Sequence, residues 1–523
     1  MSQKEEVVEE NYCLLQGFEW NVPADQKHYL RLAGALPGLK EIGIDNVWLP
    51  PACKGQGGGQ ANGYDIYDLY DLGEFDQKGS RATKWGPKED LVALSEKARD
   101  LGVGLYFDAV LNHKAGADEK EKCRVQEVDN EDRTKDVGEP FEIEAWLGFR
   151  FPGRGDKYSD QKYHWEHFSG TDYDAGSDRT GVFRILGDGK HWSRSVGREA
   201  GNADFLMFAD LDYSHPEVIA DVLHWGAWVV RQLGLRGFRL DACQHFSERF
   251  TNEFVAHLEK EFGGVVSSKK NHNKGDGSSS SLFLVGEFWS DNTDEMLEYL
   301  DNMRHPYSLF DAPLVCRFSE LSRQERADLR TVFDGTLVQA RPEAAVTVVM
   351  NHDTQPGQTV ETPVEAFFKP LAYALILLRA EGYPSVFYGD LYGMKPGQGK
   401  DGAEGQPPAC DGRLPDLVLA RKLYAHGDQE DYWTEPNCVG FVRRGTAAHH
   451  AGLACVMSNA EPGEIRMAVG DMHRGEVWTD VLRWQGDEVR IDDDGFGLFP
   501  CAGTSVSVWV NREAEGRERF GKL

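Results

Sequence analysis

Short apolar runs alternate with amphipathic stretches along most of the chain. Apolar runs of strand length occur at residues 13–18, 46–49, 103–110, 235–241, 282–287, 308–310, 346–351 and 385–388. Between them, apolar residues recur every three or four positions, as at residues 91–101 and 218–229, which predicts amphipathic helices. Eight alternating strand–helix units predict an α/β fold of the (β/α)8 TIM-barrel type, since an open sheet rarely repeats so regularly.

Two segments depart from this rhythm. Residues 114–214 carry Gly, Asp, Trp and Tyr in irregular order, so we expect an inserted domain or lid between the barrel segments 1–113 and 215–426. Residues 427–513 contain short alternating strands such as CVGFVRR and TSVSVWV, which predict a separate all-β, Greek-key-like sandwich. Residues 514–523 form a charged tail, and the Ser-, Gly- and Lys-rich residues 263–281 predict a surface loop.

The stretch GLRGFRLDACQHF places charged residues inside a run with the pattern of a buried strand. Residues two apart share a face of a strand, so Gly237, Arg239 and Asp241 point together, while Phe238 and Leu240 point to the opposite side. If Phe238 and Leu240 pack under the helices, Arg239 and Asp241 enter the barrel interior at the C-terminal end of the strand. Barrel enzymes carry their catalytic groups at that end.

Carboxylates end other apolar runs in the same way: Asp108, Glu287 and Asp353. A single buried Arg–Asp pair can also occur in a structural core. Carboxylates that recur at the ends of several predicted strands are harder to explain by packing alone. Acidic groups that converge on one barrel mouth repel each other unless cations intervene or some are protonated. Cleavage of a glycosidic bond uses such a set, because one group protonates the leaving oxygen and another meets the oxocarbenium ion.

Composition and charge narrow the class of partner. The chain has 523 residues and a formal net charge of −29, which argues against nucleic acid or anionic membrane as partners but does not affect a neutral carbohydrate. The N-terminus MSQKEEVVEENYCLL lacks the features of a secretory signal, and no apolar run is long enough to span a bilayer. Nine scattered cysteines without a CxxC spacing favour reduced thiols in the cytoplasm.

Four segments together resemble the signature regions of a known family. In order along the chain, DAVLNH, GFRLDACQH, GEFW and NHDTQ are similar to those of the α-amylase family, glycoside hydrolase family 13. The segments QGFEW, GYDIYDLYDLGEF, FPGRGDKYSD and GYPSVFYGD resemble the liquefying bacterial-type members, here in an intracellular form. The resemblance covers about residues 11–512 and identifies residues 114–214 as domain B and residues 427–513 as domain C.

The resemblance implies endo-acting, retaining hydrolysis of α-1,4-glucosidic bonds in starch, glycogen or maltodextrins. It makes Asp241 the nucleophile, Glu287 the general acid/base and Asp353 the third carboxylate, with carboxyl groups of Asp241 and Glu287 about 5–5.5 Å apart. Arg239 is expected to keep Asp241 ionised. Further residues implied to line the sugar-binding cleft are Tyr64, His113, Gln244, His245 and His352.

A single structural calcium ion is also implied. Its ligands are expected from Asn112, Asp204, Asp210 and the backbone carbonyl of His245, all hard oxygen donors that join domain B to the barrel. Ser169, Ser193 and Ser214 stand where related bacterial enzymes carry carboxylates for additional ions. Gln244 stands where many members have Lys, and Met350 where relatives often have Asp.

Two other functions remain open. A 4-α-glucanotransferase uses the same covalent intermediate but passes it to a sugar hydroxyl instead of water. A non-catalytic barrel that serves as an assembly subunit is less compatible with three intact carboxylates. We expect a monomer that binds an α-glucan substrate and neither nucleic acid nor a membrane.

Overall fold

Eight parallel strands form a closed barrel in the computed structural model, which describes residues 11–266, 281–397 and 402–522. The barrel strands are β1 (Leu14–Gln16), β2 (Asn46–Trp48), β5 (Gly104–Ala109), β12 (Gly237–Leu240), β14 (Leu282–Gly286), β15 (Ser308–Phe310), β16 (Ala345–Val348) and β17 (Tyr383–Phe387). They follow the order β12-β5-β2-β1-β17-β16-β15-β14, and the pairing of β12 with β14 closes the ring. The predicted barrel is confirmed, and each strand overlaps one predicted apolar run.

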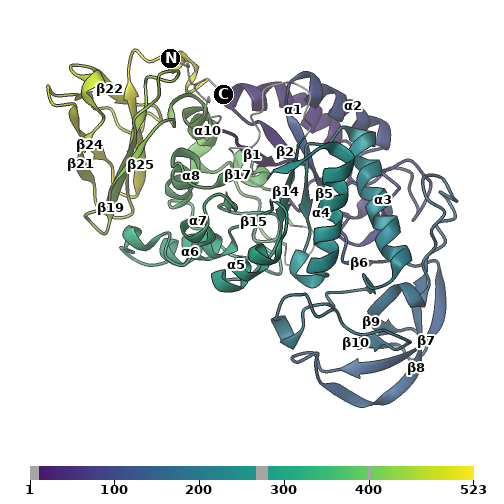
Figure 1. Ribbon diagram of the computed structural model, residues 1–523. Helices are drawn as coiled ribbons and strands as arrows, with labels where there is room; N and C mark the ends of the chain where they lie inside the picture. Colours follow the sequence, from purple (N-terminus) through teal and green to yellow (C-terminus); the bar gives the residue numbers. More distant parts are fainter. Residues whose placement is uncertain (1–10, 267–280, 398–401, 523) are drawn as a thin grey trace, which may run out of the picture.

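Helices surround the barrel on its outside (Figure 1). They are α1 (His28–Ile42), α2 (Lys88–Asp100), α3 (Pro216–Leu233), α4 (Glu248–Phe262), α5 (Thr293–Asn302), α6 (Ala312–Ser322), α7 (Leu337–Ala340), α8 (Lys369–Leu378), α9 (Tyr388–Tyr392) and α10 (Leu414–Tyr424). The predicted helical patterns at residues 91–101 and 218–229 fall in α2 and α3. None of the described helices is both long and apolar enough to cross a bilayer.

The segment between β5 and α3 folds into a sheet of its own. Its antiparallel strands are β6 (His113–Lys114), β7 (Glu119–Val128), β8 (Asp136–Gly148), β9 (Phe168–Asp174), β10 (Arg179–Ile185) and β11 (Ala209–Leu211), in the order β6-β11-β9-β10-β7-β8. Apolar side chains such as Val125, Ile143 and Phe183 form a separate core beneath it. The irregular composition of this segment had concealed these strands, because its long hairpin is largely polar and exposed.

The C-terminal part consists of two further sheets. The first contains β18 (Gln429–Tyr432), β19 (Cys438–Arg443), β20 (Leu453–Ser458), β25 (Ser505–Asn511), β22 (Val477–Asp480) and β23 (Val489–Arg490), and the second pairs β21 (Gly463–Ala468) with β24 (Phe496–Cys501). Figure 1 shows these sheets and the inserted sheet on opposite sides of the barrel. The charged tail is anchored, because Phe520 is only 1% exposed and stacks on Tyr424 of α10 at 5.9 Å.

Two short pairings complete the strands. β3 (Lys54–Gly55) pairs with β4 (Ile66–Asp68), and β13 (Val265–Val266) runs beside β14. The surface loop predicted at residues 263–281 lies largely outside the described residues.

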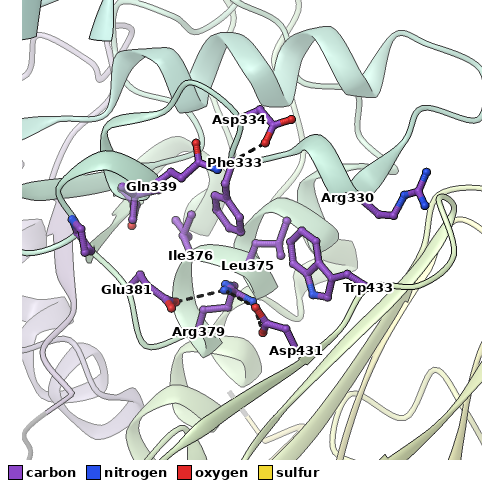
Figure 2. A pocket seen from close by; sticks show the side chains of 13 residues that line it. Arg330, Phe333, Asp334, Gln339, Leu375, Ile376, Arg379, Glu381, Asp431 and Trp433 are labelled. Carbon is purple, nitrogen blue, oxygen red and sulfur yellow. Dashed lines mark hydrogen bonds and ion pairs between the residues drawn. The ribbon is translucent and has the colours of Figure 1, made fainter. Parts of the chain in front are cut away.

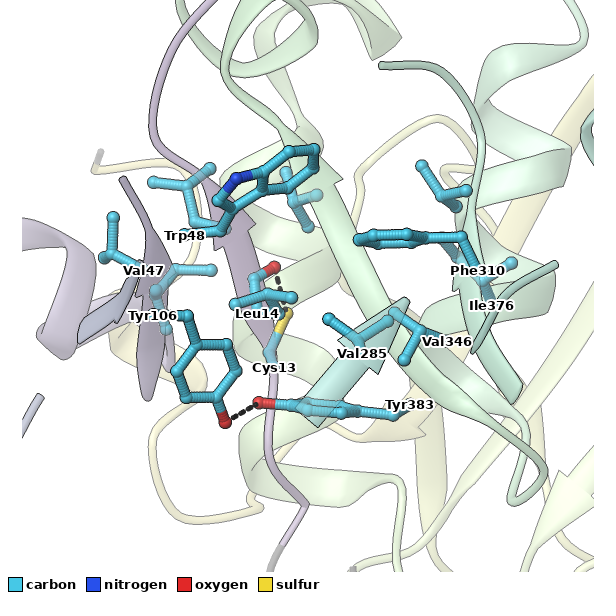
Figure 3. Packing of buried hydrophobic residues seen from close by; sticks show 14 of the residues in the cluster. Cys13, Leu14, Val47, Trp48, Tyr106, Val285, Phe310, Val346, Ile376 and Tyr383 are labelled. Carbon is cyan, nitrogen blue, oxygen red and sulfur yellow. Dashed lines mark hydrogen bonds between the residues drawn. The ribbon is translucent and has the colours of Figure 1, made fainter. Parts of the chain in front are cut away.

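Large side chains from different strands fill the barrel. Trp48 and Phe310 meet with ring centroids 5.3 Å apart, and the hydroxyls of Tyr106 and Tyr383 form a hydrogen bond of 3.3 Å (Figure 3). Gly237 leaves room for this packing, since a Cβ there would lie 2.3 Å from the carbonyl oxygen of Phe283. The barrel is therefore a packed core, and its chemistry is confined to the ends of the strands.

Candidate active site

Strand β12 places Arg239 inside the barrel. Phe238, on the opposite face, packs between Trp225 of α3 and Phe254 of α4, with ring centroids 6.3 and 5.7 Å away. Arg239 is fully buried, so the alternation predicted from the sequence holds in the structure. Because Phe238 packs against these helices, the neighbouring side chain of Arg239 points into the barrel.

Three carboxylates surround that guanidinium. Nη1 of Arg239 lies 2.7 Å from Oδ1 of Asp108 and 2.7 Å from Oδ1 of Asp241. Nη2 lies 2.7 Å from Oε2 of Glu287. The strands β5, β12 and β14 are neighbours in the barrel, so their C-terminal ends bring these groups to one rim.

The single positive charge of Arg239 does not offset the free-energy cost of burying several carboxylates, so their pKa values are raised. Desolvation raises the pKa of Asp241 to about 6, although Arg239 lowers it. Desolvation, together with the charge of Asp241, also raises the pKa of Glu287. Desolvation and the charge of Glu287 raise the pKa of Asp353 well above its usual range, which requires Asp353 to lie near the other two. The three acids that the sequence singled out thus share one electrostatic environment.

A left-handed turn follows Asp241. Ala242 has φ 46° and ψ 45°, a conformation that costs a non-glycine residue about 1 kcal/mol or more. In this conformation its backbone N–H donates a hydrogen bond of 3.2 Å to Oε2 of Glu287. The strained turn therefore links the ends of β12 and β14.

Aromatic side chains stand beside the carboxylates. Trp48 Nε1 and Tyr64 Oη donate to the same oxygen of Asp108, at 2.8 and 3.0 Å. The ring of Tyr64 is stacked on His352 with centroids 5.0 Å apart, and Trp20 lies nearly parallel to Tyr64 at 6.0 Å. Neither Trp20 nor Trp48 was predicted to have a role, although Trp20 ends the segment QGFEW, which carries part of the family resemblance.

The three predicted cleft histidines are buried, which favours their uncharged form. Desolvation lowers the pKa of His113 to about 4, and lowers the pKa values of His245 and His352 as well. Gln16 donates to Nδ1 of His352 at 2.9 Å, so Nε2 carries the proton and lies 3.3 Å from Asp353. His352 is thereby oriented toward Asp353, the predicted third carboxylate.

His113 and Gln244 make contacts with neighbouring loops. His113 Nε2 donates to the backbone carbonyl of Tyr64 at 2.8 Å, which ties the segment after β5 to the loop that carries this tyrosine. The backbone carbonyl of Gln244 accepts a hydrogen bond of 2.8 Å from Gly197. The side-chain oxygen of Gln244 is buried and has no hydrogen-bond partner among the described residues.

The predicted metal ligands gather where the inserted sheet meets the barrel. Asp204 and Asp210 are buried. Desolvation raises the pKa of Asp204 to about 7, and desolvation together with the charge of Asp204 raises the pKa of Asp210 well above its usual range. Asn112 Oδ1 is buried and accepts no hydrogen bond from the described residues. His245 Nδ1 donates to Ala203 at 2.6 Å, directly before Asp204. Two carboxylates and a free amide oxygen suit a hard divalent cation.

A lysine stands close to these acids. Lys190 Nζ is buried and donates to the carbonyls of Glu166 and Phe168 at 2.7 and 2.9 Å, and to Asp212 at 2.8 Å. Ser214 donates to the other oxygen of Asp212 at 2.5 Å. An ammonium group therefore neutralises the acid beside the predicted metal ligands.

A second group of potential metal ligands lies at the start of α3. Ligand atoms of His167, His215 and Glu217 lie within 4.8 Å of one another. His167 Nδ1 accepts a hydrogen bond from the backbone N–H of His164 at 2.9 Å, and Nε2 faces Glu217 at 3.0 Å. Imidazole nitrogens are poor ligands for calcium, so this cluster differs in chemistry from the predicted site.

A closed barrel with acids and sugar-sized aromatic rings at the C-terminal rim defines a barrel enzyme of the glycoside hydrolase class. The family model described as "Alpha amylase, catalytic domain" matches residues 32–410. The chain belongs to the alpha-amylase family.

Individual relatives are similar in sequence to this chain over nearly its whole length. The cytoplasmic alpha-amylase of Escherichia coli is 43% identical over 96% of this chain and 99% of its own length. The glucan 1,4-alpha-maltohexaosidase of a Bacillus species is 41% identical, with 96% and 93% covered. The solved structure of the Geobacillus thermoleovorans alpha-amylase superposes with a TM-score of 0.62 at 18% identity, covering 97% and 98% of the two chains, and supports the fold.

Proposed function

We propose that the chain is an endo-acting, retaining hydrolase of α-1,4-glucosidic bonds in starch, glycogen or maltodextrins. The observation that carries the proposal is the guanidinium of Arg239, whose two Nη atoms each lie 2.7 Å from one of the acids Asp241 and Glu287. Membership of the alpha-amylase family supports the same bond type.

Each acid has a separate role. The carboxylate of Asp241 attacks the anomeric carbon, while Glu287 transfers its proton to the leaving glycosidic oxygen. Glu287, now ionised, takes a proton from water, and the water oxygen displaces Asp241 from the sugar. The raised pKa of Glu287 favours the protonated form that the first step requires.

The remaining groups bind the sugar. Asp353 holds hydroxyls of the distorted ring, and Tyr64 stacks on the sugar beside the scissile bond. The uncharged imidazoles of His113, His245 and His352 donate or accept hydrogen bonds without adding charge to the cleft. Gln244 contributes its unpartnered side-chain oxygen.

One structural calcium ion belongs to the proposal. Asn112, Asp204, Asp210 and the backbone carbonyl of His245 would hold it, and its charge would offset the mutual repulsion of the two buried acids. The ammonium of Lys190 already neutralises Asp212, so the adjoining region needs no second ion. At that position the ion would join the proposed inserted domain, residues 114–214, to the proposed barrel domain of residues 1–113 and 215–426. Residues 427–513 are the proposed C-terminal domain.

A cytoplasmic location and a monomeric state complete the proposal. The relative in Escherichia coli is named as cytoplasmic. Among the described residues, which include all nine cysteines, no disulfide bond forms, as expected in a reducing compartment.

Chromatography of the products from maltoheptaose tests the function. Hydrolysis inside the chain releases only fragments shorter than the substrate, initially in the α-anomeric form. A 4-α-glucanotransferase would instead produce chains longer than maltoheptaose. Absence of any cleavage would contradict both functions and favour a binding subunit.

A further inference from the structure

A buried lysine contacts both segments that carry the parallel aromatic rings of the candidate active site. Lys84 lies between β4 and α2 and is only 5% exposed. Its ammonium donates a hydrogen bond of 3.1 Å to the backbone carbonyl of Trp20 and another to the side-chain oxygen of Asn62. Neither partner is one of the three acids, so Lys84 has no part in the chemistry of bond cleavage.

The backbone of Trp20 is held at both of its polar groups. Its N–H donates to Oε1 of Gln355 at 2.9 Å, and its carbonyl accepts from Lys84. The amide of Gln355 in turn donates to Glu19 at 3.2 Å. The ring of Trp20 therefore projects from a backbone that Lys84 and Gln355 fix from two sides.

The second hydrogen bond of Lys84 reaches the segment that ends at Tyr64. Asn62, which accepts this bond, is followed by Gly63, whose φ of 102° lies in the region that favours glycine. This turn leads directly into Tyr64, whose ring plane is inclined by only 2° to that of Trp20, with centroids 6.0 Å apart. One ammonium thus joins the two segments whose rings lie parallel.

The surroundings of the ammonium restrict its position. Nζ of Lys84 lies 4.8 Å from the ring centroid of Trp85, a fully buried side chain, in a cation–π contact. Nε1 of Trp85 also donates to the backbone carbonyl of Asn62 at 3.1 Å. Burial lowers the pKa of Lys84 to about 8, although the charge of Glu19 opposes the shift, so the ammonium form predominates at neutral pH.

We propose that Lys84 is a positioning residue for substrate binding, which holds the ring of Trp20 parallel to that of Tyr64 so that the two form one surface for sugar rings. The inference rests on the proposed function, because it assigns the ligand of these rings as an α-glucan. A surface that is already ordered before binding gives higher affinity, since less freedom is lost when the ligand arrives. Lys84 therefore acts on KM and leaves kcat unchanged.

Steady-state kinetics on maltoheptaose test the inference. Lys84→Met keeps an unbranched apolar stem and removes the ammonium, so KM should rise about 2- to 10-fold, up to the effect of losing one aromatic contact. Asn62→Ala removes only the second acceptor and should raise KM in the same direction by a smaller factor. It decides the matter if Lys84→Met does not fold.

Lys54→Met is the matched control. Lys54 is also buried, and its ammonium donates to the backbone carbonyls of Phe75, Ser80 and Arg81 at 3.0, 2.7 and 2.8 Å, but to neither of the two segments that carry the rings. Lys54→Met should lower Tm, as should Lys84→Met, and should leave KM unchanged. An equal rise in KM for both variants would show a general effect of removing a buried lysine and would overturn the positioning role.

A double variant separates an action through Trp20 from an independent one. In a Trp20→Ala background, Lys84→Met should raise KM by a smaller factor than it does alone, because the ring that it positions is already absent. Equal factors in the two backgrounds would overturn the inference.

Calorimetric titration with maltoheptaose measures binding without cleavage. The parent protein carries Asp241→Asn, so that the substrate stays intact, and the addition of Lys84→Met should raise Kd by about the same factor as KM. An unchanged Kd in both Lys84→Met and Asn62→Ala would overturn the inference. Failure of the unmodified enzyme to cleave maltoheptaose would instead overturn the proposed function, and the titration would still measure the effect of Lys84 on binding.

Discussion

Nη2 of Arg239 lies 2.7 Å from Oε2 of Glu287 in the interior of the barrel. The same guanidinium also contacts Asp108 and Asp241, so one positive charge is shared by three acids. Ionisation of all the acids would leave excess negative charge in a buried site, which favours the retention of at least one proton. The arrangement thereby provides an acid and a carboxylate side by side.

Substitution of the proposed acid/base should remove hydrolysis without unfolding the chain. Glu287→Gln keeps the shape and cannot supply a proton, so kcat on maltoheptaose should fall by about 10²–10⁴-fold. Initial rates, with circular dichroism as a check of folding, measure the effect. Glu253→Gln, on the exposed face of α4, is the control and should retain full activity. An active Glu287→Gln enzyme would refute the assignment.

The pH profile should have an acid limb set by Asp241. Its pKa is raised to about 6, and the nucleophile must be ionised, so kcat/KM should fall about tenfold per pH unit below that value. Asp108→Asn removes a negative charge that raises this pKa and should move the limb to lower pH. If kcat/KM of the unmodified enzyme fell only near the usual pKa of an aspartate, the proposed environment of Asp241 would be wrong.

Trp20 should contribute to substrate binding. Its ring is parallel to Tyr64 and His352 at 6.0 Å from each, which extends the stacking surface beside the carboxylates. Trp20→Ala should raise KM for maltoheptaose about 2- to 10-fold, the effect of losing one aromatic contact of about 0.5–1.5 kcal/mol. Trp146→Ala, which removes a 44% exposed tryptophan from β8, is the control and should leave KM unchanged. An unchanged KM in Trp20→Ala would exclude Trp20 from the cleft.

Calcium should stabilise the fold through Asp204 and Asp210. Dialysis against EDTA should lower Tm, and calcium at about 100 times its Kd should restore about 2.7 kcal/mol. Asp204→Asn should abolish this response in thermal unfolding. Glu217→Gln, in the cluster with His167 and His215, should leave it intact. If Glu217→Gln abolished the response to calcium and Asp204→Asn did not, the histidine cluster would be the calcium site instead.

Lys190 should stabilise the inserted sheet. Its ammonium and the carboxylate of Asp212 are both 8% exposed, so Lys190→Met leaves a buried charge unpaired and should cost about 3 kcal/mol of unfolding free energy. Lys122→Met breaks an exposed pair with Glu142 and should cost less than about 1 kcal/mol. Equal losses in urea unfolding would show that Lys190 is not an internal counter-ion.

Much of the architecture could be predicted from local pattern. The alternation of Phe238 and Leu240 with Arg239 and Asp241 fixes which side chains enter the barrel, because a strand repeats every two residues. The eight apolar runs, alternating with helical patterns, were sufficient to predict a closed barrel. The polar hairpin of β7 and β8 was missed, since its strands bury few side chains and lack a clear alternation.

The sequence by itself determined the barrel, the family and the acids at the strand ends, because periodicity and short motifs are local properties. Only the tertiary structure decided which groups share Arg239, that Trp20 lies parallel to Tyr64, and that Lys190 neutralises Asp212. It also decided that Thr347 of β16 and Trp433, which follows β18, line one cavity between the barrel and the C-terminal sheet (Figure 2). These relationships join residues far apart in the chain, and no local pattern encodes the distance between them.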